Sequence, residues 1–218
     1  MSPNSIRLIF ILLAALLSGA LPFFFFSFRA PDDLFFGIWQ SIFVYAVFLL
    51  ILPMAFVRFV LREPAANFGL QVKRLSRKDA AWFAVLFLSA LAVTFLAAEV
   101  FDTQAFLKPP EFALVSFWLF LLFVVLLHGI FTFFYEVFFR GFLLLGTARS
   151  LGHWSILLSF FAFLVFLWAS GTLGWQNVPV IISSLFAGVL AYRTRSILWS
   201  FLFSFFFGIL VSIASAAL

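Results

Sequence analysis

Cysteine is absent from this chain of 218 residues, and histidine occurs only twice, as His128 and His153. The first absence excludes disulfides, thiolate metal sites and cysteine nucleophiles, and the second limits any metal site built on histidine. Charged residues make up only 10% of the sequence, against about 25% in an ordinary soluble domain. Hydrophobic residues make up 66%, and the mean hydropathy is +1.24. This composition predicts a polytopic membrane protein with one transmembrane domain over residues 1–218 and no soluble domain.

Seven apolar stretches have the composition of membrane-crossing helices, each of which needs about 20 mostly apolar residues. Because backbone groups in lipid must bond to one another, we expect an all-α transmembrane bundle. The fourth stretch is too long for one simple crossing, so we expect it to continue as a short helical extension and to bend near Gly141. The expected spans are residues 8–28, 34–57, 80–98, 112–145, 154–170, 175–192 and 197–218.

Lysine and arginine are unevenly divided between the two sides that these spans define. The far side has only Arg29 and Lys108. The N-terminal side has Arg7, Arg58, Arg62, Lys73, Arg74, Arg77, Lys78, Arg149, Arg193 and Arg195. The positive-inside rule therefore predicts a cytoplasmic N-terminus. The net charge of +5 therefore reflects the orientation of the protein in the membrane and gives no support to a nucleic-acid partner. We expect the basic cluster 73–78 to lie at an anionic lipid surface.

Ionisable residues inside the expected spans cluster in one segment, where a central charge costs about 2.5–3.5 kcal/mol and usually marks a functional position. Glu136 and Arg140 are one helical turn apart with the acid first, the favoured order for an i,i+4 pair. His128 and Thr132 continue this stripe in steps of four, and Tyr135 borders it. Spacing leaves two interpretations open: an ion pair that ties this helix to its neighbours, or a catalytic role.

A metal ion shared by His128 and Glu136 is disfavoured, since eight residues separate them by about 12 Å along a helix axis. His153 lies beside Trp154 in an expected loop, which is typical of an interfacial residue. The residues alone therefore predict no metal site and no cofactor.

The run Tyr135 to Leu144, YEVFFRGFLL, resembles the first motif of the CPBP family, the CAAX-protease and bacteriocin-processing (Abi) intramembrane proteases. That motif has the form Glu-Glu-x-x-x-Arg, followed by Gly and apolar residues. Residues 62–70 resemble the loop that precedes the core helices of this family, and residues 192–198 resemble the segment before its last motif. The resemblance defines a CPBP-like core over residues 112–210.

The resemblance implies a helical bundle in which two glutamates, two histidines and an Asn or Asp activate water with a metal ion for peptide-bond cleavage. Glu136 and Arg140 match the first motif, but Tyr135 stands where its first glutamate would be. The first motif is therefore only partly retained.

The other two motifs are degenerate. Trp168 stands at the histidine position of the second, and Ser204 and Gly208 stand at the His and Asn positions of the third. No histidine follows His153, so no shift of the alignment supplies either ligand. Small residues instead recur at every fourth position of the last span, which is typical of close helix packing. This ridge comprises Ser200, Ser204, Gly208, Ser212 and Ala216, and Ser184 with Gly188 form a shorter version in the sixth span.

These observations favour a degenerate CPBP-like protein, a pseudoenzyme that acts in the membrane as a binding, scaffolding or assembly subunit. Its expected partners are the lipid bilayer and another membrane protein, in the bacterial cytoplasmic (inner) membrane. One alternative is an active intramembrane metalloendopeptidase with a non-standard site around Glu136, Tyr135 and His128, which would require a divalent metal such as zinc.

A second alternative is an unrelated transporter or lipid-binding protein. Broken helices at the centre of the membrane favour that class. The sequence offers only weak candidates for such breaks, at Pro22, Pro53 and Gly129.

Overall fold

The computed structural model describes residues 3–26, 34–101, 115–174 and 177–217. Helices account for 88% of these residues, and no strand occurs among them. Five helices are long and apolar enough to cross a membrane. The all-α prediction is therefore confirmed, and the fold is a helical membrane bundle.

Two of the long helices contain π-helical segments but run on without a break. The helix over residues 34–61 comprises α2 (Leu34–Tyr45), η1 (Ala46–Ile51), α3 (Leu52–Ala55) and η2 (Phe56–Leu61). The helix over residues 117–151 comprises α6 (Phe117–Phe120), η4 (Leu121–Leu127), α7 (His128–Tyr135), η5 (Glu136–Leu145) and α8 (Gly146–Leu151). The remaining helices are α1 (Pro3–Phe26), the 3₁₀ turn η3 (Ala65–Phe68), α4 (Arg77–Phe101), α9 (Trp154–Ala169), α10 (Val178–Thr194) and α11 (Ile197–Ala217).

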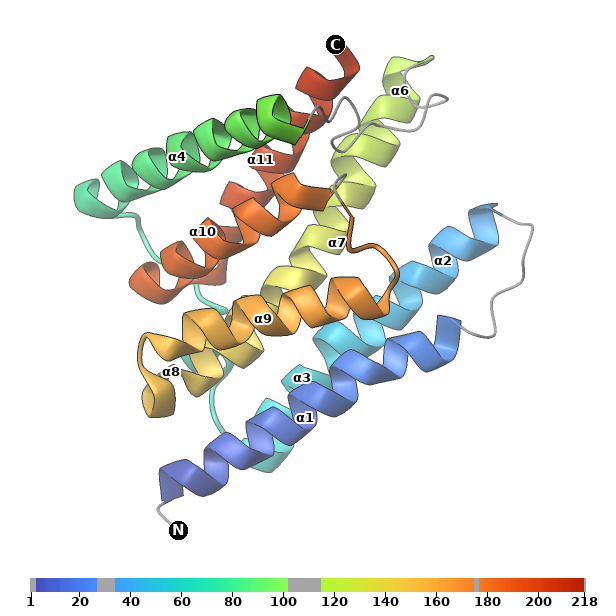
Figure 1. The fold of residues 1–218 in the computed structure, drawn as a ribbon. Helices are drawn as coiled ribbons and strands as arrows, with labels where there is room; N and C mark the ends of the chain where they lie inside the picture. Colours follow the sequence, from blue (N-terminus) through green and yellow to red (C-terminus); the bar gives the residue numbers. More distant parts are fainter. Residues whose placement is uncertain (1–2, 27–33, 102–114, 175–176, 218) are drawn as a thin grey trace.

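Consecutive helices run in alternating directions, so their ends lie at two opposite ends of the bundle (Figure 1). The helices α9 and α10 have 16 and 17 residues, which corresponds to lengths of about 24 and 26 Å. The hydrocarbon core is about 30 Å thick. These two helices therefore fall short of the length criterion that the other five meet.

Several helix boundaries differ from the expected ones. The third span was expected from Ala80, but α4 begins at Arg77 because Ser76 caps it: the amide of Asp79 donates to Ser76 Oγ at 3.1 Å, and Ser76 Oγ donates to the Asp79 carboxylate at 2.6 Å. The fourth stretch was expected to end at Leu145, but its helix continues to Leu151, and Gly141 lies inside η5 without ending it. The expected starts of the fourth and sixth spans, at residues 112 and 175, lie outside the described residues.

The three candidate breaks do not interrupt their helices. Pro22 lies inside α1, Pro53 lies inside the helix 34–61, and Gly129 lies inside the helix 117–151. A transporter-like pair of discontinuous helices is therefore not found at these positions.

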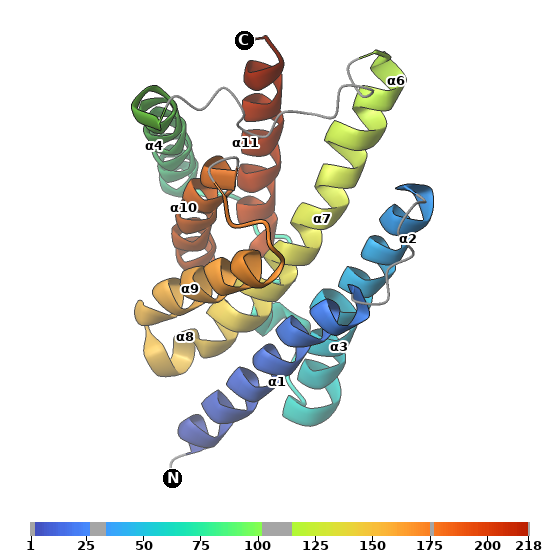
Figure 2. The same ribbon diagram turned by 45° about the vertical axis from the view of Figure 1, so that its right-hand side comes forward.

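The segment η5 forms the centre of the bundle, and all ten of its residues are buried. The helix that contains it runs diagonally, with α4, α10 and α11 on one side and α1 and the helix 34–61 on the other (Figure 2). Along η5 it packs against α9, α10, α11, α1 and η3. Any polar side chain of η5 must therefore find its partners inside the protein.

Candidate functional site

Glu136 and Arg140 form the ion pair that their spacing predicts. Their side chains are only 2% and 3% exposed, and Arg140 Nε lies 3.6 Å from Glu136 Oε1. Both belong to η5, where the backbone is π-helical; such segments are often found at functional sites. The pair is therefore deeply buried, and its remaining polar atoms depend on neighbouring helices.

Three other helices contact this pair. Ser204 of α11 donates a hydrogen bond to Glu136 Oε1 at 2.9 Å. The Nη2 atom of Arg140 donates to the backbone carbonyl of Ser184 in α10 at 2.8 Å. The guanidinium also lies 5.5 Å from the ring centroid of Phe163 in α9. The polar cluster thus joins η5 to α9, α10 and α11.

A cavity of about 40 Å³ lies beside the cluster. It is lined by His128, Thr132, Tyr135, Glu136, Arg140, Phe163, Val180, Ser183, Ser184, Ser204, Phe207 and Gly208. Three buried polar atoms of this lining make no hydrogen bond within the described part of the chain: Glu136 Oε2, Arg140 Nε and Ser184 Oγ. Buried polar groups are normally satisfied by protein or ordered water, and a cavity of this size has room for a few water molecules. The arrangement is that of a small pocket with three buried polar atoms in its wall.

His128 enters the same cavity from α7, although it is two turns away from Glu136. Its Nε2 atom lies 3.4 Å from Thr132 Oγ1, and its ring is stacked 6.1 Å from that of Phe205. The ring lies over Gly208, where an added Cβ atom would overlap it. The expected stripe of His128, Thr132 and Glu136 therefore borders one pocket.

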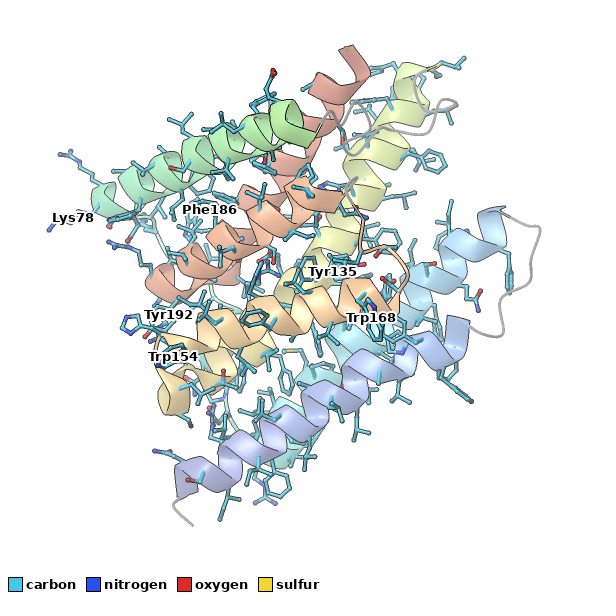
Figure 3. The ribbon with its side chains drawn as sticks, viewed as in Figure 1. Lys78, Tyr135, Trp154, Trp168, Phe186 and Tyr192 are labelled. Carbon is cyan, nitrogen blue, oxygen red and sulfur yellow. The ribbon has the colours of Figure 1, made fainter. Side chains whose placement is uncertain are left out.

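Tyr135 borders the pocket from within an aromatic cluster. Its ring centroid lies 5.8 Å from that of Tyr45, 6.1 Å from Phe163 and 5.7 Å from Phe166. These contacts fix Tyr135 between α9 and the helix 34–61, in the interior of the bundle (Figure 3).

Of the three degenerate motif positions, the structure brings two to the pocket. Ser204 and Gly208 line it, whereas Trp168 does not and is 70% exposed at the end of α9 (Figure 3). The helix α9 contributes Phe163 in its place.

The other residues of the expected packing ridge on α11 differ in their burial and in what they contact. Ser200 is fully buried and donates to the carbonyl of Ile197 in its own helix at 3.0 Å. Ser212 is half-buried. Gly208 makes room for the ring of His128 rather than for a helix backbone. Close packing of small residues therefore describes only part of this helix face.

Two serines of α10 were not anticipated at the site. Ser184 was expected to contribute to helix packing, and no role was predicted for Ser183, yet both serines line the pocket. Adjacent serines in an apolar stretch of this helix are the signal that would have found them.

The ligands needed for a catalytic metal are not assembled in the pocket. Catalytic zinc sites use three protein ligands, and among the described residues no group of three His, Cys, Asp or Glu side chains is close enough to hold an ion. The pocket itself offers one carboxylate and one imidazole. The donor set does not fit the metal that the CPBP resemblance implies.

Fold and site together define an integral membrane protein with a buried, charged polar cluster at the centre of a helical bundle. No family model, curated protein or solved structure matches the chain.

Proposed function

We propose that this chain is a CPBP-like integral membrane protein without protease activity, which acts as a binding, scaffolding or assembly subunit in the bacterial cytoplasmic membrane. The observation that carries the proposal is the use of Glu136 as a structural group. Its Oε1 atom accepts from Ser204 and pairs with Arg140, which in turn binds the Ser184 carbonyl. The carboxylate that the family uses for catalysis here holds helices together.

The proposal includes seven membrane crossings with a cytoplasmic N-terminus. Five long apolar helices, the alternating directions of all the helices and the distribution of cations support it. The short helices α9 and α10 would cross a locally thinned region, because a short apolar helix is accommodated by thinning of the bilayer.

A direct test is proteolysis by the purified protein in lipid nanodiscs. Wild type and the Glu136→Gln variant are incubated with peptides that contain an apolar transmembrane segment, with and without added zinc, and new termini are read by mass spectrometry. We expect no cleavage that depends on Glu136. Cleavage by wild type that disappears in the variant would overturn the proposal.

The subunit role has its own test in native membranes. We expect the mildly solubilised protein to migrate in a complex with a second membrane protein, and crosslinking from the exposed face of α1 to identify that partner. Exclusive migration as a monomer or homo-oligomer would contradict a subunit role even if proteolysis is absent.

The active alternative is favoured by one observation: Glu136 Oε2 makes no hydrogen bond to any residue that the structure describes, and it lies beside a pocket that His128 also lines. A carboxylate with a free oxygen is able to act as a general base on water. In the proteolysis assay this metalloendopeptidase alternative requires Glu136-dependent cleavage that metal chelation abolishes. Because the donor set of the pocket does not fit a catalytic metal, we do not expect such cleavage.

A further inference from the structure

The polar loop between Leu61 and Arg77 is fixed to the turn between α10 and α11, more than 120 residues away in the sequence. Four hydrogen bonds join the two segments: Ile197 N to Gly69 O at 3.1 Å, Ser196 Oγ to Gln71 O at 3.1 Å, Gln71 Nε2 to Arg195 O at 3.4 Å and Trp199 Nε1 to Lys73 O at 3.1 Å. The loop therefore has a defined position beside this turn.

A second set of contacts joins the first turns of α4 to the last turn of α10. The Nε atom of Arg193 lies 3.9 Å from the Asp79 carboxylate, and its guanidinium lies 4.5 Å from the ring centroid of Trp82. The start of α4 is thereby held next to the same turn that holds the loop.

These contacts gather six cations from three segments on one surface, which we call the basic loop surface: Lys73, Arg74, Arg77, Lys78, Arg193 and Arg195. All six side chains are exposed. Asp79 is the one acidic residue in the sequences 69–82 and 191–199, and Arg193 already pairs with it. Cations gathered on one surface repel one another, so the surface favours an anionic partner.

Aromatic side chains of the kind found at the edge of a bilayer lie next to this surface. Trp82 and Trp154 are 42% and 70% exposed, and Tyr192 contacts both His153 and the guanidinium of Arg195. Lys78, Tyr192 and Trp154 lie along the same edge of the molecule (Figure 3). Exposed Trp and Tyr are typical of the membrane–water interface.

We propose that the basic loop surface binds the phosphate headgroups of anionic lipids in the cytoplasmic leaflet. Clusters of four to eight cations next to a membrane helix act in this way. The surface lies on the side that the positive-inside rule assigns to the cytoplasm, where anionic headgroups are within reach of both the cations and the aromatic rings. The proposal rests on this orientation and is independent of whether the protein is a protease.

The test uses the full chain in nanodiscs that contain phosphatidylcholine and an increasing fraction of phosphatidylglycerol, with bound lipid read by native mass spectrometry. The test variant is K73Q/R74Q. Its matched control, R58Q/R62Q, removes two exposed cations from the same side but outside the surface. Because the chain has no cysteine, an introduced Ala66→Cys reports the orientation of every variant in intact cells, through its accessibility to a membrane-impermeant thiol reagent.

We expect wild type to prefer phosphatidylglycerol, and K73Q/R74Q to lose roughly 25-fold in that preference at about fivefold per cation, with R58Q/R62Q changing it much less. High salt should reduce the wild-type preference, because exposed charges are screened. Equal loss in the control, or no wild-type preference, would overturn the proposal. Binding of a short DNA duplex by wild type in neutral nanodiscs, without a lipid preference, would also overturn it in favour of a soluble polyanion.

Discussion

Ser204 of α11 donates a hydrogen bond of 2.9 Å to Oε1 of Glu136, the same oxygen that lies 3.6 Å from Arg140 Nε. One carboxylate oxygen thus has two partners, whereas Oε2 has none within the described residues. The serine hydroxyl is the shorter of the two contacts, so α11 has the larger part in orienting the carboxylate. The polar cluster is therefore a contact between helices as well as a pair within one helix.

Replacement of Ser204 by Ala should loosen α11 from η5. The variant removes the shortest contact of the buried carboxylate, and hydrogen bonds between membrane helices are worth about 0.6 kcal/mol on average and up to about 1.7. We expect a loss within this range in thermal unfolding of the detergent-solubilised protein. Ser212→Ala, two turns further along α11, is the matched control. An equal shift in both variants would show that the Glu136 contact is not what stabilises this interface.

Removal of Arg140 alone should be more harmful than removal of the whole pair. Arg140→Met leaves Glu136 buried without its cation, which costs about 3–5 kcal/mol, whereas an apolar replacement of both members of a buried pair is often neutral or stabilising. We expect the double variant Glu136→Met with Arg140→Met to recover most of the lost stability. Unfolding free energies in a double-mutant cycle measure this directly. If the stability losses of the two single variants simply add in the double variant, the two residues are not coupled as a structural pair.

Gly208 should be required because of His128. A Cβ atom at position 208 would overlap the imidazole ring, and overpacking of this kind costs about 1–3 kcal/mol. We expect Gly208→Ala to lower the melting temperature and His128→Ala to restore it in the double variant. At Gly188 an added Cβ atom would meet side-chain methyl groups only at 3.6 Å, so Gly188→Ala is the tolerated control. If the double variant does not recover the melting temperature, the steric conflict at position 208 involves a residue other than His128.

The parts of the site that sequence could predict are local to one helix. Glu136 and Arg140 pair because i,i+4 spacing places them on one face, and His128 and Thr132 follow the same periodicity. The helical fold was equally accessible, since apolar runs of this length leave few other options in a membrane. Composition alone could not predict whether the short helices α9 and α10 cross the membrane completely, because apolar residues do not by themselves establish a full crossing.

The rest of the site depends on contacts that leave little trace in the sequence. Arg140 binds a backbone carbonyl of Ser184, and any residue type supplies a carbonyl. The orientation of Trp168 depends on its angular position on the helix. It follows Phe163 by five residues, which places it about 140° further around the axis of α9. Because Phe163 faces the pocket, Trp168 points outward and is exposed. The number of residues between Arg140 and Trp168 does not show which side of α9 Trp168 faces.

A separate polar network at the N-terminal side is the best place for a pH test. Glu63 accepts from Arg7 Nε at 2.7 Å, from Asn67 at 3.1 Å and from Arg149 at 3.3 Å. Arg7 also donates to the carbonyl of Gly146 at 2.6 Å, so the network joins α1, the polar loop and α8. Partial burial by itself would raise the pKa of Glu63, but the hydrogen bonds from Arg7 and Asn67 and the charges of Arg7 and Arg149 lower it below the ordinary value of 4.5.

Because the pKa of Glu63 is lowered in the folded protein, its network stabilises the fold fully above about pH 5 and is lost as the pH falls from 4.5 through the folded value. We expect Glu63→Gln to lower the melting temperature at pH 7, by about 1 kcal/mol in stability, and to decline less than wild type between pH 5 and pH 3. Arg7 is 14% exposed and Arg149 is 53% exposed, so Arg7→Gln should destabilise more than Arg149→Gln. The same acid decline in wild type and in Glu63→Gln would exclude Glu63 as its source.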